Sequence, residues 1–251
     1  MIPLNAPDLG PTEEAAILDA FRTGWVGLGP WVTRFEHEFA AWVGRQYAVA
    51  CSSGTAALWL SIEALRLPAG QGIVTSAYTC DALANAAIHA TGRPPRVVDV
   101  EAATWGASGP DLAALLDEDR SESGRREVGA VILPHTYGVM ARDTLAIEAL
   151  CRGHELPLIE DASEAPGATL QGRKAGSIGL ASVFSFRSEK TLSGGQLGIV
   201  VTDSKGFARR VHQLAHCGLP VDRLRFWSTL PGMNFQPSHL TQTWNSHLHR
   251  S

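Results

Sequence analysis

The chain has 251 residues and a formal net charge of −4, with a sequence pI near 6.1. A chain of this length can bury a substantial core, as one large α/β domain or two modest ones. The mildly acidic charge excludes a basic surface of the kind that binds nucleic acid or an anionic membrane, so we expect a small-molecule partner.

The cysteines do not indicate a metal centre or a disulfide framework, because they lie far apart without a Cys-x-x-Cys pair. Thiols of this kind fit a reducing cytoplasm. Residues 1–7 lack a charged segment followed by an apolar stretch, and no apolar run reaches the length of a membrane span. We therefore expect a cytoplasmic protein with no membrane partner. The four cysteines are Cys51, Cys80, Cys151 and Cys217.

Short β-rich runs alternate with helical patterns along the chain, which is typical of βαβ units on a mainly parallel sheet. An amphipathic helix is predicted at residues 13–23, followed by a glycine-bearing turn at 24–30. The predicted strands are residues 47–51, 72–76, 96–100, 128–134, 156–160, 182–186 and 198–202. The predicted helices are residues 55–65, 80–90, 111–116, 143–152 and 207–216, and the charged segment 118–126 is interpreted as an exposed loop.

The first candidate site is Cys51-Ser52-Ser53-Gly54-Thr55-Ala56-Ala57-Leu58, where a strand ends in small residues and a helix begins. A helix start offers N–H groups and the positive end of the helix dipole to an anion. Gly54 would let the backbone approach a phosphate, and Thr55 would add a hydroxyl. Ordinary N-capping by a serine or threonine is the alternative interpretation.

Two further candidates follow later strands. Tyr78 comes just after residues 72–76, where its ring could stack on a flat cofactor or pack in the core or at its rim. Asp161 ends the run Leu158-Ile159-Glu160-Asp161, at the sheet edge where open α/β sheets bind ligands. Its carboxylate could pair with a protonated pyridine nitrogen, or it could cap a turn.

Lys190 is one of only three lysines, with Lys174 and Lys205, in a chain that otherwise uses arginine. It follows the strand-like run 181–184 in Ser185-Phe186-Arg187-Ser188-Glu189-Lys190. An amine can form a Schiff base with an aldehyde cofactor and a guanidinium cannot. Ser185 could place a hydroxyl on a cofactor phosphate. A solvated surface lysine is the alternative.

Taken together, these features resemble the pyridoxal-phosphate-dependent sugar aminotransferases of the DegT/StrS type, which have the fold type I architecture. The likeness runs from Ile2-Pro3 to about Leu240. Its motifs are Gly24-Trp25, Phe35-Glu36, Ser53-Gly54-Thr55-Ala56-Ala57-Leu58, Pro134-His135-Thr136-Tyr137-Gly138, Glu160-Asp161-Ala162, Ser185-Phe186 with Lys190, and Gly232-Met233-Asn234.

The resemblance implies a three-layer α/β/α fold with a mainly parallel seven-stranded sheet. It implies that pyridoxal 5'-phosphate is bound with Lys190 as the Schiff-base residue and Asp161 at the ring nitrogen. It further implies a homodimer with shared active sites, because Asn234 matches an asparagine that reaches the neighbouring subunit's cofactor phosphate. By the same resemblance, Gly54, Thr55 and Ser185 would hold the phosphate and Tyr78 would stack on the ring.

The implied activity is transfer of an amino group from an amino acid, glutamate in this family, to a nucleotide-linked keto-sugar. The freed Lys190 amine would move the proton between the substrate and the cofactor. The product would be an amino-sugar nucleotide for polysaccharide or natural-product synthesis. The related sugar dehydratases carry a histidine where this chain has Lys190.

The chain departs from the family at three places. Glu164 stands where the family has glutamine or histidine near the cofactor's phenolic oxygen. An ionised carboxylate there would be repelled by a phenolate, so we expect Glu164 to be protonated, turned away or a sign of altered chemistry. Leu197 replaces a glycine in Gly195-Gln196-Leu197-Gly198. We expect one cofactor-binding domain over residues 1–240 with an N-terminal helical segment, and a short polar tail at 241–251 in place of the family's small C-terminal domain.

Other interpretations stay open. The chain could be a truncated, non-catalytic protein that binds pyridoxal phosphate, or a subunit that completes another chain's site. A nicotinamide-binding Rossmann enzyme is disfavoured, because no predicted strand is followed by Gly-x-Gly-x-x-Gly. His135 and Tyr137 could contact substrate or pack in a turn, and Trp25 could contact substrate or a subunit. We interpret the end of the chain, with His239 just before the tail and His247 and His249 within it, as solvated and expect no metal.

Overall fold

The structure is a computed structural model that describes residues 9–24, 27–121, 126–221 and 227–237. The chain divides into two compact units, residues 1–57 with 184–251 and residues 58–183. The interpretations of Trp25 and of the tail at 241–251 lie outside the described residues. In the described part of the chain, no helix is long and apolar enough to cross a bilayer.

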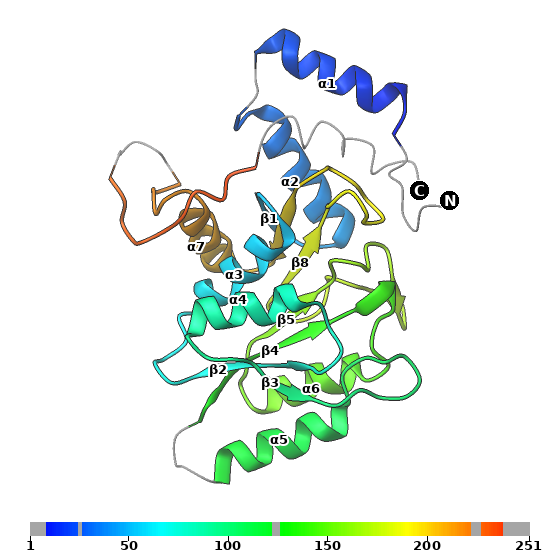
Figure 1. The fold of residues 1–251 in the computed structure, drawn as a ribbon, viewed down its shortest axis with the longest axis vertical. Coiled ribbons are helices and arrows are strands. Elements are labelled where there is room, and N and C mark those ends of the chain that lie inside the picture. The colour runs from blue at the N-terminus through cyan, green and yellow to red at the C-terminus, as the bar shows by residue number, and fades with distance from the viewer. Residues whose placement is uncertain (1–8, 25–26, 122–125, 222–226, 238–251) are drawn as a thin grey trace. The chain divides into compact units, whose positions relative to one another are not determined.

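Seven strands form one sheet in the order β1-β9-β8-β5-β4-β2-β3 (Figure 1). The β2–β3, β2–β4, β4–β5 and β5–β8 pairs are parallel and the β1–β9 pair is antiparallel, which confirms the predicted mainly parallel sheet. The strands are β1 (Tyr47–Cys51), β2 (Gly72–Ser76), β3 (Arg96–Val98), β4 (Val128–Pro134), β5 (Leu158–Asp161), β8 (Ala181–Ser185) and β9 (Gly198–Thr202). A short hairpin, β6 (Thr169–Leu170) with β7 (Arg173–Lys174), forms a separate two-stranded sheet.

The predicted strands match the observed ones closely, and three of the seven have shifted boundaries. Strand β5 starts at Leu158 and not at Leu156, because the Leu156 N–H bonds the Cys151 carbonyl at the end of the preceding helix and Pro157 has no N–H to donate. Strand β3 ends at Val98, and Val100 makes only an isolated bridge with Ala107. Strand β8 starts and ends one residue earlier than predicted.

The helices of the first unit include one that the sequence analysis missed. They are α1 (Pro11–Thr23), α2 (Pro30–Val43), the first turn of α3 (Gly54–Leu65) and α7 (Lys205–Ala215). For this part of the chain the sequence predicts a turn at residues 24–30 and no helix after it, whereas α2 begins at Pro30. Proline at its first position and Gly44 at its C-cap, with φ of 93°, are ordinary helix boundary signals.

Helix α2 builds the core of the first unit. The ring of Phe39 packs edge-on against Phe184 and Phe186, with centroids 4.9 Å and 5.2 Å apart, and Phe35 contacts Phe186 at 5.3 Å. These four side chains are almost completely buried. Because Phe184 and Phe186 flank the end of β8, the aromatic cluster fixes the segment that leads to Lys190.

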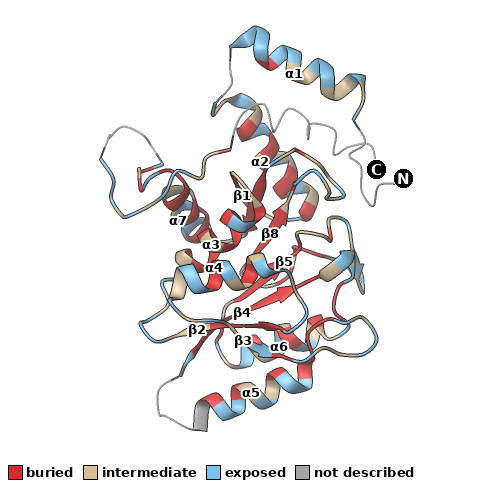
Figure 2. Cartoon of the chain, viewed as in Figure 1, coloured by how far each residue is buried: buried red, intermediate tan, exposed pale blue. Residues whose placement is uncertain are grey.

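The second unit contains β2 to β7, the start of β8 and the rest of α3, with helices α4 (Asp81–Thr91), α5 (Gly109–Ser121), α6 (Thr144–Gly153) and the short 3-10 helix η1 (Thr136–Gly138). Figure 2 shows β4 and β5 coloured as buried, in agreement with the apolar run of β4 and with Leu158 and Ile159 in β5. Helix α4 packs on β2, and α5 packs on β3 and α6.

The interpretation of residues 118–126 as an exposed loop is wrong for their first part, because α5 continues to Ser121. Asp119 is buried and accepts hydrogen bonds from the backbone N–H groups of Glu127 and Val128, and it pairs with Arg96 at 3.1 Å. A charged residue that looked solvent-facing in the sequence is therefore a structural acceptor. Residues 122–125 lie outside the described part.

Candidate functional site

The first unit places the predicted phosphate residues at the start of α3. Ser53 caps the helix, since its Oγ accepts a hydrogen bond from the Ala56 N–H at 3.1 Å. The capping alternative therefore holds for Ser53. Thr55 is exposed and Gly54 is buried, so the helix start presents a hydroxyl beside a compact backbone.

Gly54 and Ser185 lie in van der Waals contact within this unit. A Cβ on Gly54 would stand 2.7 Å from the Ser185 Cβ and 3.0 Å from its Oγ, so only glycine fits. Gly198 is equally restricted, because its Cβ would stand 2.2 Å from the Ser53 carbonyl oxygen. The arrangement brings a serine hydroxyl to a helix N-terminus, which is a suitable donor set for a phosphate group.

Lys190 lies in a turn that begins at the end of β8. Its backbone N–H donates to the Arg187 carbonyl at 2.8 Å, and its side chain is partly buried. The turn is fixed on both sides of Phe186, whose N–H donates to the Leu197 carbonyl and whose carbonyl accepts from the Gly194 N–H, each at 2.8 Å. The candidate Schiff-base residue therefore lies four residues after a buried phenylalanine whose backbone is hydrogen-bonded through both its N–H and its carbonyl.

Leu197 does not need the backbone freedom of the glycine that it replaces. Its side chain is fully buried, and it is not among the described residues with a positive φ. Gly195 has a φ of 76° and makes the nearby turn. This departure from the family pattern is thus accommodated by packing.

Asn234 lies on a segment that the structure places beside the start of α3. The Phe235 carbonyl accepts the Ser52 N–H at 2.8 Å, and Asn234 forms an isolated bridge with His216. The Asn234 side chain is exposed, and its Oδ1 accepts from the Gln236 N–H at 3.3 Å. The sequence reasoning assigned this asparagine only through the family resemblance.

In the second unit, Asp161 ends β5 and is buried, with 7% exposure. Its Oδ1 accepts from the Ser163 N–H at 3.1 Å, so one carboxylate oxygen caps the following turn as the alternative interpretation stated. The Asp161 carbonyl accepts from the His135 N–H at 2.9 Å. A carboxylate held in this way at a strand's carboxyl end is chemically suited to a cationic ring nitrogen.

The carboxylate of Glu160, the residue before Asp161, accepts four hydrogen bonds, and the sequence analysis assigned it no structural role. Its Oε1 accepts from the Ile178 N–H and the Ser182 hydroxyl, and its Oε2 accepts from the Gly176 N–H and His135 Nε2, at 2.6 to 3.0 Å. Both side chains of the Glu160–His135 pair are fully buried. For His135, the packing alternative therefore describes the structure, and its sequence pattern gave no sign of this partner.

Tyr78 lies on the surface of the second unit among other rings. It is 39% exposed, and its ring centroid is 5.6 Å from that of Trp105 and 6.3 Å from that of Tyr137. Hydrogen bonding to Tyr137 is the main cause that raises the pKa of the Tyr78 hydroxyl. Trp105 was not singled out in the sequence, because a lone tryptophan in a loop carries no pattern.

Glu164 is turned toward the backbone. Its Oε2 accepts a hydrogen bond from the Tyr137 N–H at 2.7 Å. One carboxylate oxygen is therefore bound to a backbone donor, and the three possibilities stated for this carboxylate beside the cofactor stay predictions.

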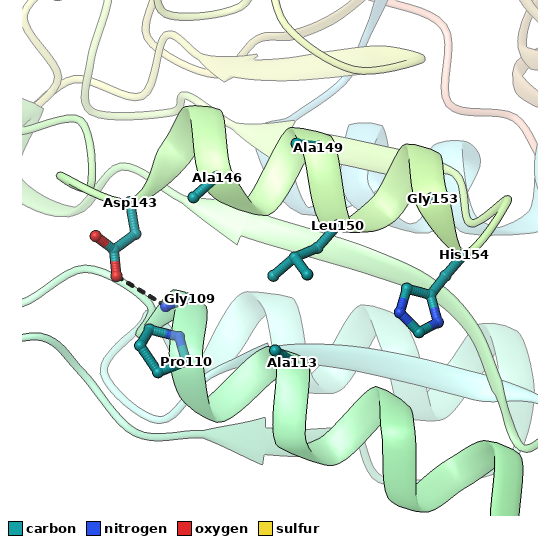
Figure 3. Close-up of a pocket in the computed structure, with 9 residues that line it drawn as sticks. All are labelled: Gly109, Pro110, Ala113, Asp143, Ala146, Ala149, Leu150, Gly153 and His154. Atoms are coloured by element: carbon teal, nitrogen blue, oxygen red, sulfur yellow. Dashed lines mark hydrogen bonds between the residues drawn. The ribbon is translucent and has the colours of Figure 1, made fainter.

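A separate groove of about 730 Å³ lies between α5 and α6 and contains none of the predicted site residues (Figure 3). Its wall is made mainly of small side chains, and Asp143 Oδ2 closes one end by accepting the Gly109 N–H at 2.9 Å. In the described ranges, no group of three His, Cys, Asp or Glu side chains could hold a metal ion.

The sheet order, the glycine-lined helix start and the carboxylate at the end of β5 define a protein of the fold type I aminotransferase class. A solved aminotransferase of this class, TlmJ from Streptoalloteichus hindustanus, superposes with a TM-score of 0.88 at 31% identity, covering 98% of this chain and 65% of that one. The chain belongs to the DegT/DnrJ/EryC1/StrS aminotransferase family, whose pattern matches residues 7–241. Aminotransferases of this family depend on pyridoxal phosphate.

Two curated relatives are similar over most of this chain. The spore coat polysaccharide biosynthesis protein SpsC of Bacillus subtilis is 34% identical over 218 residues, which is 87% of this chain and 54% of SpsC. The GDP-perosamine synthase of Caulobacter vibrioides is 31% identical over 240 residues, which is 95% of this chain and 62% of the synthase. The chain therefore spans between about half and two thirds of the length of these relatives.

Proposed function

We propose that this chain binds pyridoxal phosphate through Lys190 and serves the transfer of an amino group from an amino acid to a nucleotide-linked keto-sugar. Glutamate is the donor that we propose, and polysaccharide or natural-product amino sugars are the proposed products. The observation that carries the proposal is the contact of Gly54 with Ser185 at the start of α3, since this close approach fits a phosphate and excludes any larger residue. The names of the relatives, a perosamine synthase and a polysaccharide biosynthesis protein, support the sugar class.

When bound, the cofactor supplies an aldehyde that condenses with amines and a ring that withdraws electrons from the substrate carbon. In the proposal, Thr55, Ser185 and the α3 N-terminus hold its phosphate. Asp161 keeps a proton on the ring nitrogen through its negative charge. The Nζ of Lys190 carries the proton to and from the reacting carbon, which an arginine could not do at neutral pH.

We propose further that residues 1–240 act as the cofactor-binding domain and that two copies associate, with Asn234 reaching the partner's phosphate. Helix α1 supports the association, because its apolar Leu18 and Phe21 are 44% and 61% exposed. Tyr78 stacks on the cofactor ring in this proposal, with Glu164 at the rim of the site.

The test is reconstitution with pyridoxal phosphate, followed by absorbance spectroscopy and borohydride reduction. The wild-type chain should gain a band at the violet end of the visible range, and borohydride should fix the cofactor on Lys190, as peptide mass spectrometry would report. Lys190→Ala should lose both signals. Lys205→Ala, which removes an exposed lysine at the start of α7, is the matched control and should keep both.

Addition of glutamate should then abolish the band of the wild-type chain. A reconstituted chain without any band would contradict the proposal. A band that borohydride fixes on Lys190 but that glutamate leaves unchanged would favour the alternative, a cofactor-binding protein without transfer activity.

A further inference from the structure

Three aromatic rings meet on the surface of the second unit. Trp105, Tyr78 and Tyr137 are 60%, 39% and 76% exposed, and the ring centroid of Tyr78 lies 5.6 Å from that of Trp105 and 6.3 Å from that of Tyr137. Contiguous exposed apolar surface is unfavourable in water and marks binding surfaces. We call these three residues the ring surface.

The backbone of the ring surface is strained at two positions. Trp105 has a φ of 60° and Tyr137 a φ of 54°, in the left-handed region that bulky residues rarely adopt. Strain of this kind costs free energy and persists where the surrounding structure holds it, often at ligand sites. Both strained residues project large side chains that stay exposed.

A compact turn holds Trp105. The Trp105 N–H donates to the Glu101 carbonyl at 3.0 Å, and the Glu101 N–H donates to the Gly106 carbonyl at 2.9 Å. Gly106 lies against Ala141, where a Cβ would stand 2.3 Å from the Ala141 Cβ. The backbone of the turn is therefore hydrogen-bonded and closely packed at Gly106.

The carboxylate of Glu164 holds Tyr137. The 2.7 Å hydrogen bond from the Tyr137 N–H to Glu164 Oε2 is charge-assisted when the carboxylate is ionised, and it fixes the backbone in the left-handed conformation. The next residue, Gly138, has a φ of 81°, and a Cβ there would stand 3.2 Å from the Glu164 carbonyl oxygen. Residue 164 thus touches the Tyr137 turn through both its side chain and its backbone.

We propose that Glu164 is a positioning residue that holds Tyr137 beside Tyr78, and that Tyr137 and Trp105, the two neighbours of Tyr78, form a stacking surface for the pyranose ring of a nucleotide-linked sugar. The inference rests on the proposed function, because Tyr78 is assigned there to the cofactor ring. A sugar that reacts at the cofactor must lie next to Tyr78, and the ring of Tyr137 is a neighbour of Tyr78. The nucleotide base, which is further from the reacting carbon, is not assigned to this surface.

This role also explains how a carboxylate is accommodated at position 164. A glutamate aimed at a phenolate oxygen would be repelled. The negative charge on Glu164 Oε2 is stabilised by the hydrogen bond from the Tyr137 N–H, and the same bond holds the Tyr137 turn. A glutamine would offer a carbonyl oxygen to the same N–H, whereas a leucine of similar size would offer no acceptor.

The first test is a spectrophotometric titration of the tyrosines in cofactor-free protein, which has only Tyr47, Tyr78 and Tyr137. The groups that raise the pKa of Tyr78 are Tyr137 and, more weakly, the charge of Glu164. Glu164→Leu should therefore lower the Tyr78 midpoint, and Tyr137→Phe should lower it as well. Glu164→Gln should lower the midpoint by less than Glu164→Leu does, because it removes the charge but keeps an acceptor for the Tyr137 N–H.

If residue 164 acted on Tyr78 only through its charge, the glutamine and leucine variants would give the same curve, and that result overturns the positioning role. Circular dichroism establishes that each variant is folded. Tyr137→Phe changes only an exposed hydroxyl, so it tests the Tyr78–Tyr137 link even if Glu164→Leu does not fold.

The second test is calorimetric binding of GDP-mannose, UDP-glucose and dTDP-glucose to the reconstituted protein, each compared with its nucleoside diphosphate. Trp105→Ala, Tyr137→Ala and Glu164→Leu should each weaken binding of the nucleotide sugar by about tenfold, the loss expected for one stacked ring. The nucleoside diphosphate should change by less than about twofold, which is within the spread of a neutral substitution. Glu164→Gln should bind like the wild type.

An equal loss for the nucleotide sugar and its nucleoside diphosphate would assign the surface to the base and overturn the inference, as would a lack of binding by all three sugars. The two proposals fail separately. A missing cofactor band contradicts the proposed function, whereas matching titrations of the glutamine and leucine variants contradict only the inference.

Discussion

The backbone of Gly54 lies so close to Ser185 that a methyl group on Gly54 would stand 2.7 Å from the Ser185 Cβ. Gly54→Ala should therefore move α3 or Ser185 and cost about 1–3 kcal/mol of folding free energy through overpacking. Affinity for pyridoxal phosphate should fall by at least about tenfold, because donor positions must be kept within a fraction of an ångström. Urea unfolding and a cofactor titration measure the two effects.

Gly206→Ala is the matched control for that substitution. Gly206 lies in α7 of the same unit, and no atom lies within 4 Å of its added Cβ. Alanine favours the helical conformation, so the variant should be unchanged or stabilised by up to about 1 kcal/mol. Equal cofactor affinity of Gly54→Ala and Gly206→Ala would show that the close approach has no part in binding.

Glu160→Gln should destabilise the second unit by about 3–5 kcal/mol, the range for breaking a buried charged network. Each carboxylate oxygen of Glu160 receives two donors, so the amide NH₂ of a glutamine would face donors in either orientation. Urea unfolding at neutral pH measures the loss. Glu148→Gln, which removes a partly exposed pair with Arg173, should cost at most about 1 kcal/mol, and a comparable loss in both variants would refute the argument.

Burial raises the pKa of Glu36 to about 7 in the folded protein, although the Ala50 N–H donates to its Oε1 at 2.8 Å. The unfolded carboxyl has the lower pKa, so the folded state binds the extra proton between these two values. Stability should therefore fall as pH rises from about 4.5 to about 7 and then level off, by at most about 3 kcal/mol. Partial contact with solvent makes the true change smaller.

Glu36→Gln isolates this effect. The amide keeps an oxygen acceptor for Ala50 but has no proton to bind, so the variant should lose that pH-dependent component. The difference in unfolding free energy between variant and wild type, measured at pH 5 and pH 8, is the readout. A difference that is the same at both pH values would rule out Glu36 as the group responsible.

The four cysteines should differ sharply in their reaction with iodoacetamide at pH 8. Cys51 and Cys151 are buried, and desolvation raises the pKa of each thiol to about 12, so almost no thiolate is present. Cys80 and Cys217 are exposed. Peptide mapping of the native protein should find label on the exposed pair alone, and labelling of Cys51 before unfolding would contradict the buried position of β1.

The sequence was sufficient for the sheet because its strands are continuous apolar runs bounded by turns, as in β4. The positions of Gly54, Tyr78 and Asp161 at or just after the ends of β1, β2 and β5 follow from local pattern in the same way, whereas Asn234 was assigned only through the family resemblance. Helix α2 has ordinary boundary signals in Pro30 and Gly44, but its start overlaps the glycine-bearing stretch 24–30, whose composition is typical of a turn.

The contacts across the sequence could not be predicted in the same way. Glu160 receives donors from residues 16 to 25 positions away, and Glu164 reaches Tyr137 across 27 positions. Such pairs depend on which strands become neighbours and on loop conformations with positive φ. Local patterns of hydrophobicity and charge contain neither.

Gly198 also bears on how β1 finds its place beside β9. The two antiparallel strands pair Cys51 with Gly198 and Tyr47 with Thr202, and the missing side chain at 198 makes room for the Ser53 carbonyl. A slip of two residues would keep every side chain on its face, but it would bring Gln196 or Val200 to that carbonyl. The misaligned pairings of the two apolar strands are therefore destabilised, because only the register with Gly198 opposite Cys51 leaves space for the Ser53 carbonyl. A Gly198→Val variant should populate the misaligned pairings during refolding.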